Sequence, residues 1–417
     1  MAKARNINPA ILKWARDSAR LPLKEAAERI GFTSSDKLSA AEKLERIEAG
    51  DDYPTRNQLI KIASVYRRPL TTFYLKEPPR TGERGEDFRT LPASVSPRDN
   101  ALLDSLLRDM RARQEMVRGL LEDEDEGSAH PFVGSASLRD GVPRVAASIA
   151  ETLGFDPLKR RAGNAGYLFR ALRTRTEAIG VFVLLVADLG SHHSAISEKV
   201  FRGFAIADPI APFVVINDQD AKAARSFTLL HELAHIWLGQ TGVSGTPESA
   251  EPTTQSEMVE RFCNDVAGEI LLPPAALPQR PANLAPGDKD RVVPLVDSIA
   301  AQWSVSQPMV AYRLHRLGWI TPSLYSDLCS SYAARWHATK HREKEKNKEK
   351  EGGPTYYTMR QYSLGDALID VVRRTLRGNA LTDTKAAKML GIKPGLVETL
   401  LRTVEKGRGP FPHDHGG

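Results

Sequence analysis

Residues 227–239 read FTLLHELAHIWLG, and this segment sets the architecture of the middle of the chain. Apolar residues on most of its faces predict a buried helix. Residues four apart lie on the same side of a helix, so His231 and His235 present two imidazoles in one direction. Two neutral imidazoles at this spacing can bind one divalent cation, with Glu232 beside the metal as a general base rather than as a ligand.

A second helix is predicted over EMVERFCNDVAGEILL, residues 257–272, which is followed by two prolines. Glu260 lies on its polar stripe, and a carboxylate there completes a His-His-Glu ligand set that leaves the fourth zinc position open. Glu257 and Glu269 are alternative third ligands. The alternative to a metal site is a pair of core histidines that bond to backbone, with Glu232 at the surface. The second helix favours the metal site.

Apolar segments before the first helix predict a small sheet, with strands over 180–186, RGFAIAD at 202–208 and APFVVIND at 211–218. Residues 101–121 and 143–178 have helical spacing. Residues 294–318 have a helix-turn-helix pattern, for which we favour a structural role.

The two central helices resemble the ImmA/IrrE family of metallopeptidases, whose fold is similar to that of thermolysin-like zincins. The first family motif is Phe-Thr-Leu-x-His-Glu-x-x-His. The second motif is carried here by Glu260, Asn264, Ala267, Leu271 and Pro273. The resemblance covers roughly residues 80–330.

The resemblance implies a Zn²⁺ endopeptidase in which His231, His235 and Glu260 are the ligands and Glu232 is the general base; another divalent ion such as Mn²⁺ is the alternative. It also implies that 211–218 is the edge strand against which an extended substrate lies. The expected substrate is a repressor or antitoxin-like regulator. An oxyanion-stabilising residue is not assigned; His192 and His193 are candidates but fit a loop better.

The positive charge of the chain is concentrated at its start. Residues 1–80 hold 16 of the 58 basic and 10 of the 52 acidic residues, so the 42 of each sign that remain cancel. This asymmetry favours a polyanion-binding domain attached to a neutral body. Five short helices are predicted here, over 9–19, 22–30, 34–49, 55–66 and 70–75, with a glycine between the second and the third.

Residues 43–79, KLERIEAGDDYPTRNQLIKIASVYRRPLTTFYLKEPP, resemble the end of a lambda-repressor-like (XRE-type) DNA-binding domain. The matching positions are Glu48, Gly50, Pro54, Leu59 and Ala63. The resemblance implies duplex DNA as a partner, with Lys37, Lys43 and Arg46 on the recognition helix. The alternative is a helical domain that docks a protein.

The expected fold is multidomain and mainly α with a small sheet (α+β). An all-α helix-turn-helix domain (1–80) precedes a linker and helical arm (81–140), a zincin-like peptidase domain (141–335), a charged linker (336–354) and a small helical, helix-turn-helix-like region (355–417). A dimer is plausible.

Composition excludes several classes of protein. The longest apolar run, residues 181–187, is too short to span a membrane, and the first residues lack the apolar core of a signal peptide. Two cysteines, Cys263 and Cys329, cannot form a disulfide framework. A cytoplasmic protein is expected, without a membrane partner.

Two functions follow as hypotheses. The first is a DNA-binding, zinc-dependent, site-specific endopeptidase that regulates transcription, in response to stress, by cleaving a partner. The alternative is a transcription regulator whose peptidase-like domain senses a ligand without proteolysis. An intact His-Glu-x-x-His motif with Glu260 favours the first, because a sensor has no need of the general base.

Overall fold

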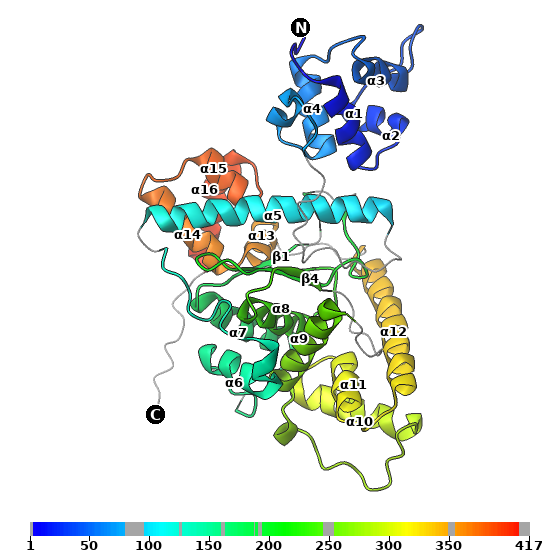
Figure 1. Ribbon diagram of the computed structural model, residues 1–417, viewed down its shortest axis with the longest axis vertical. Helices are drawn as coiled ribbons and strands as arrows, with labels where there is room; N and C mark the ends of the chain where they lie inside the picture. The colour runs from blue at the N-terminus through cyan, green and yellow to red at the C-terminus, as the bar shows by residue number, and fades with distance from the viewer. Residues whose placement is uncertain are drawn as a thin grey trace. The chain divides into compact units, whose positions relative to one another are not determined.

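The computed structural model describes residues 3–79, 96–124, 127–159, 163–186, 188–190, 194–244, 254–348 and 355–407. The chain divides into two compact units, the small unit (1–86 and 92–109) and the large unit (87–91 and 110–417). Helices predominate, and one four-stranded sheet is present in the described parts, so the fold class is α+β (Figure 1). No helix among the described residues is long and apolar enough to cross a membrane.

The small unit is a cluster of short helices around one apolar core. Its first elements are α1 (Pro9–Ser18), α2 (Leu23–Ile30), α3 (Ala40–Ala49), α4 (Arg56–Tyr66) and the 3-10 turn η1 (Leu70–Tyr74). Asn8 caps α1 by accepting a hydrogen bond from the Ala10 amide at 3.0 Å, with Pro9 in the first turn. Gly31 ends α2 at φ 84°, a left-handed conformation that favours glycine.

A buried ion pair joins three helices of the small unit. Glu48 on α3 is 9% exposed and accepts a hydrogen bond from Arg16 Nε on α1 at 2.9 Å. The Tyr66 hydroxyl on α4 donates to the same carboxylate at 3.3 Å. A buried carboxylate of this kind is costly without partners, so Glu48 has a structural role here.

The third helix starts later than the sequence predicts. Ser39 caps α3 through a capping box with Glu42, and Ser35 and Leu38 pair in an isolated β-bridge just before it. The prediction that the helix begins at residue 34 is therefore wrong. Lys37, predicted on the recognition helix, lies in the turn that precedes α3.

The sheet of the large unit has the strand order β1 (Phe182–Leu185), β3 (Phe213–Ile216), β2 (Gly203–Ile206), β4 (Gly242–Ser244). β1 and β3 are parallel, and the other two pairs are antiparallel. The prediction that 211–218 is an edge strand is wrong, because β3 is paired on both sides and every one of its residues is buried. The edges are β1 and β4.

Several helices of the large unit lie before its C-terminal region, and one of them packs against the sheet. These are the C-terminal part of α5 (Pro97–Asp123), α6 (Val142–Thr152), α7 (Ala165–Ala178), α8 (Arg225–Trp237), α9 (Gln255–Leu271), α10 (Lys289–Trp303), α11 (Gln307–Arg316) and α12 (Pro322–Lys348). α8 contacts β2, β3, α6, α7 and α9, and it lies beside α9 under the sheet (Figure 1). The helix-turn-helix pattern at 294–318 falls on α10 and α11, whose apolar residues join the same core.

The C-terminal helices lie against the edge strand β1. They are α13 (Tyr356–Leu364), α14 (Asp366–Arg377), α15 (Asp383–Leu390) and α16 (Val397–Gly407). α13 and α14 contact β1, so they cover an edge that would otherwise be open to pairing. Arg173 of α7 holds this arrangement, because it pairs with Glu177 at 2.9 Å and donates to the carbonyls of Val183 on β1 and Tyr362 on α13.

We expect Arg173→Ala to lower the free energy of unfolding of the large unit by about 3–5 kcal/mol, because it leaves the Glu177 carboxylate buried without its partner. Both side chains are less than 10% exposed. Urea unfolding followed by circular dichroism measures the change. Arg170→Ala, at an exposed position of the same helix, is the control and should change stability little. Equal midpoints for the two variants would contradict the role of Arg173.

Candidate metal centre

The helix α8 is buried on nearly all sides, which is unusual for a segment with charged side chains. From Arg225 to Trp237, Phe227 alone is half-buried and every other residue is buried. Such a helix belongs in the centre of a domain, where the polar groups it carries need specific partners. His231, Glu232 and His235 are three of these groups, beside Arg225, Ser226 and Thr228.

Three side chains converge beside this helix. The Nε2 atoms of His231 and His235 are 3.1 Å apart. Glu260 of α9 reaches both, with Oε2 at 3.3 Å from His231 Nε2 and Oε1 at 3.2 Å from His235 Nε2. Both histidines are at most 3% exposed. The structure thus brings together the three residues predicted as ligands.

The spacing of these atoms suits a tetrahedral ion. Ligands about 2.0–2.1 Å from zinc lie about 3.3–3.4 Å from one another, which is close to the Nε2–Nε2 separation and to the distance from each Nε2 atom to its nearer Glu260 oxygen. All the candidate ligand atoms of the group lie within 4.8 Å of one another. Two imidazoles and one carboxylate are also a donor set of zinc hydrolases. The residues therefore fit a divalent metal.

The remaining nitrogens of the two rings argue against ordinary core histidines. Nδ1 of His231 and Nδ1 of His235 are buried and have no hydrogen-bond partner among the described residues. Histidines placed only for packing would have those atoms bonded to backbone, because an unpaired buried polar atom costs about 1–3 kcal/mol. The alternative of backbone-bonded histidines does not fit this geometry.

The electrostatics of the group call for a positive charge. Burial acts to raise the pKa of Glu260, but hydrogen bonds and charges from His231 and His235 outweigh burial and hold that pKa well below its usual range. Burial acts to lower the pKa of His235, while contacts with Cys263 and Glu260 raise it well above its ordinary value. Glu260 therefore stays ionised, and a cation beside it is favourable.

Glu232 occupies a tight space between the helix and the sheet. Its side chain is fully buried. A Cβ added at Gly203 on β2 would lie 2.6 Å from Glu232 Oε1 and 2.7 Å from Thr228 Cγ2, closer than such atoms approach. Glycine at 203 thus lets the strand backbone approach the carboxylate and leaves room for Glu232 between the helix and the sheet.

Cys263 is a neighbour of this group that the sequence did not single out. It is fully buried one turn after Glu260 on α9, and it contacts His235. Burial raises the pKa of its thiol and outweighs the effect of His235, so the thiol is neutral. Its position three residues after Glu260 was the available signal, but apolar periodicity assigned it to the core.

The other residues considered in the sequence lie elsewhere. Glu257 is exposed and caps α9 through a capping box with Thr254. Glu269 pairs with Arg313 of α11. His192 and His193 lie outside the described residues.

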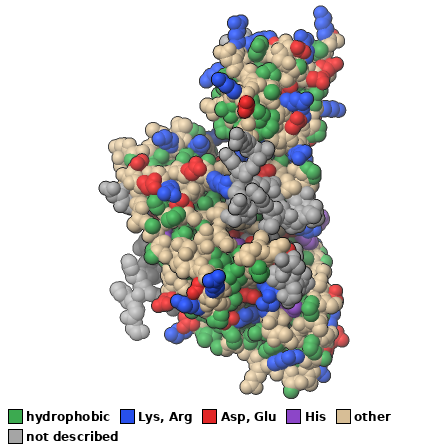
Figure 2. Space-filling view, viewed as in Figure 1, with side chains coloured by type: hydrophobic (Ala, Val, Ile, Leu, Met, Phe, Trp, Pro, Cys, Tyr) green, Lys and Arg blue, Asp and Glu red, His purple; other side chains and the backbone are tan. Residues whose placement is uncertain are grey.

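The residues predicted to contact DNA are in the small unit. Lys37 and Arg46 are exposed, and Lys43 is half-buried with Nζ donating to the Thr33 carbonyl at 2.7 Å. Lys43 and Arg46 lie on α3. Blue Lys and Arg side chains are spread over the visible face of this unit (Figure 2).

The region that holds the candidate metal centre matches the model of a known protein family. Residues 183–315 match the model of the family described as Peptidase_M78, the IrrE N-terminal-like domain. The match spans the segment from β1 to α11, with His231, Glu232, His235 and Glu260 inside it. It supports the resemblance to ImmA/IrrE proteins and to metallopeptidases. Searches of curated proteins and of solved structures gave no match to the chain.

We expect the purified chain to bind about one Zn²⁺ and Glu260→Gln to weaken that binding by at least about a hundredfold, since losing a group that merely supports a ligand already costs tenfold to a hundredfold. Competition with a chromophoric chelator measures the affinity. Glu257→Gln, on the same helix but away from the group, should bind as the parent does. Unchanged affinity in Glu260→Gln would place the third ligand elsewhere.

Proposed function

We propose that this chain is a zinc-dependent endopeptidase in which His231, His235 and Glu260 hold the metal and Glu232 is the general base. The observation that carries the proposal is the convergence of two imidazoles and a carboxylate beside a fully buried second carboxylate. The match of residues 183–315 to a peptidase family supports it. Mn²⁺ is the alternative metal.

The chain's own residues have separate tasks in this reaction. When bound, zinc supplies Lewis-acid chemistry, which activates water and polarises a carbonyl. Glu232 accepts the proton of the attacking water and passes it to the leaving amine, which is a task for a carboxylate next to the metal rather than on it. Gly203 leaves room for the Glu232 carboxylate, because a side chain at that position would lie too close to it.

The proposed cellular role is regulation of transcription by cleavage of a repressor or antitoxin-like partner, with the small unit bound to duplex DNA. The cationic excess of residues 1–80 and the exposed Arg46 support DNA binding. The alternative role, a sensor that binds a ligand without cleaving a partner, uses the same domains but does not need Glu232. Replacing Glu232 therefore separates the two.

We expect Glu232→Gln to lower the rate of peptide hydrolysis by two to four orders of magnitude, about 3–5 kcal/mol of barrier, because the variant loses proton transfer and keeps the metal ligands. Cleavage of a proteome-derived peptide library, read by mass spectrometry, measures the loss, and the zinc content of each sample is determined in parallel. Glu257→Gln should cleave as the parent does. A Glu232→Gln protein with full regulatory activity in cells would favour the sensor.

We expect the full chain to bind duplex DNA with an affinity that falls steeply with salt, since phosphate contacts release counterions. Arg46→Ala should lower the slope of log affinity against log salt by about 1, as expected for one lost phosphate contact. Lys13→Ala, at an exposed position of α1, is the charge-matched control and should leave the slope unchanged. Absence of binding to any genomic fragment at low salt would indicate a protein partner instead.

A further inference from the structure

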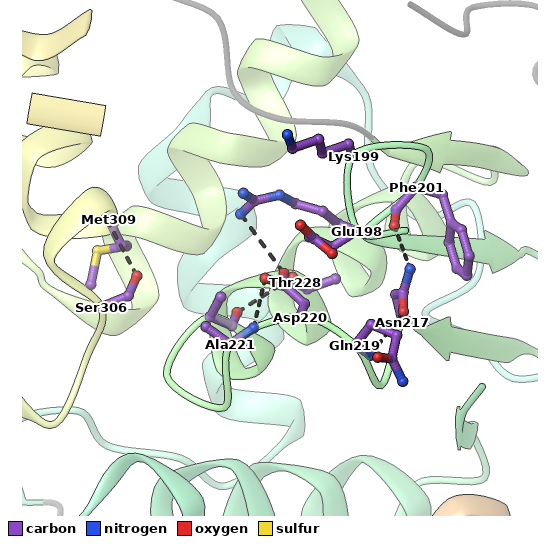
Figure 3. Close-up of polar contacts among 12 residues, drawn as sticks. Glu198, Lys199, Phe201, Asn217, Gln219, Asp220, Ala221, Thr228, Ser306 and Met309 are labelled. Carbon is purple, nitrogen blue, oxygen red and sulfur yellow. Dashed lines mark hydrogen bonds and ion pairs between the residues drawn. The ribbon is translucent and has the colours of Figure 1, made fainter. Parts of the chain in front are cut away.

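The large unit contains a cavity of about 690 Å³ beside the start of α8. Its walls come from α10, α11 and α12, from the first turn of α8 and from the segment that leads into β2. Met309 and Ser306 lie across from Glu198 and Asp220 (Figure 3). A cavity of this size can enclose a ligand as large as a drug molecule or a few peptide residues.

Most of the lining is apolar or aromatic. The larger side chains of the lining are Phe227, Met309, Tyr312, Tyr325, Tyr332 and Trp336. Alanines fill the spaces between them on α10, on α12 and in the segment just before α8, which leaves room for a ligand's side chains. A lining of this composition stabilises an apolar ligand by removing its surface from water.

The acidic side chains of the cavity are paired within the chain. Their cationic partners and the separations are Glu198 with His337 at 3.6 Å, Asp220 with Arg202 at 3.8 Å and Asp297 with Arg335 at 3.8 Å. Two of these carboxylates lie beside an arginine, and the third lies beside a histidine, which is positively charged when protonated. The cavity therefore offers little to attract a cationic ligand. Lys199 also lines the cavity, but it is exposed, so its ammonium group can stay in water. An uncharged, apolar occupant therefore suits the lining best.

The cavity lies beside the candidate metal centre, although His231, Glu232, His235 and Glu260 are not among its lining residues. Phe227 lines the cavity, and its ring centroid lies 6.4 Å from that of His231, one turn further along the same helix. Arg202, at the opposite wall, immediately precedes Gly203, whose backbone lies against Glu232. A molecule that fills the cavity therefore ends close to the group that holds the metal and the general base.

We propose that this cavity binds a short apolar segment of the peptide substrate next to the bond that is cut, and so determines which sequences the peptidase accepts. The proposal rests on the proposed peptidase function. It predicts that cleavage sites are marked by Leu, Met, Phe or Trp on one side, and that charged residues are excluded there.

Filling the cavity tests the proposal. Ala333 lines the cavity from α12, whereas its neighbour Ala334 does not, and both positions are exposed. Ala333→Trp therefore occupies the space without disturbing the core, and Ala334→Trp is the matched control. Both are made in the full-length Glu232→Gln chain, so that peptides bind without being cut. The probes are capped tetrapeptides whose central residues are drawn from Leu, Met, Phe and Trp, compared with a set drawn from Ser, Asn and Asp.

We expect the apolar peptides to bind the Glu232→Gln chain and its Ala334→Trp derivative more tightly than the polar set does. Ala333→Trp should weaken their binding by about tenfold or more, measured by equilibrium dialysis, with an unchanged circular dichroism spectrum. Equal binding of the two peptide sets, or no effect of Ala333→Trp, would overturn the proposal. If Ala333→Trp loses peptide binding but the chain with Glu232 intact cuts no peptide, the peptidase function is refuted and the proposed peptide site stands.

Discussion

The structure of the large unit depends on burying a helix that carries ionisable groups. α8 brings two imidazoles and the Glu232 carboxylate into a core where isolated charges are costly, and α9 adds Glu260 at 3.3 and 3.2 Å from the imidazole nitrogens. Glu260 stays ionised there, because contacts with both imidazoles hold its pKa well below the usual range. A cation beside Glu260 would balance that charge, so the packing that shapes the core also brings together residues that suit a metal.

The elements around α8 are placed by this requirement. The sheet lies close to the helix because Gly203 has no side chain to collide with Glu232. Arg225 is the first residue of α8. It donates hydrogen bonds to the Tyr362 hydroxyl of α13, at 3.1 Å, and to the Asp218 carbonyl. The C-terminal helices thus cover the edge strand β1 and also hold the beginning of the helix that carries the site. Their position is part of the architecture of the large unit.

The sequence predicted the site better than its surroundings, and the reason lies in the range of the interactions. Local geometry predicted that the i, i+4 histidines share one face of a helix, whereas the choice of Glu260 over Glu257 and Glu269 on a second helix came from the resemblance to the ImmA/IrrE motif. The place of β3 in the sheet depends on its pairing with β1 and β2, which a local sequence pattern does not reveal. β4 has three residues, too few to show an alternation of apolar and polar side chains. Ser34 and Ser39 are both capping residues by type, but Glu42, three residues after Ser39, forms a capping box with it, a local signal that the predicted start at residue 34 missed. The role of Lys37 on a recognition helix failed for the same reason.

Specificity and chemistry share one helix in the arrangement proposed here. Phe227 faces the cavity and His231, one turn later, faces Glu260, so a substrate that fills the first is presented to the second. Folded proteins keep most large apolar side chains buried, and contiguous exposed apolar segments are uncommon on their surfaces. A peptidase that admits substrates through an apolar cavity therefore cuts segments that are both apolar and accessible. That combination restricts the enzyme to few partners, and it requires the partner's own conformation to expose the site.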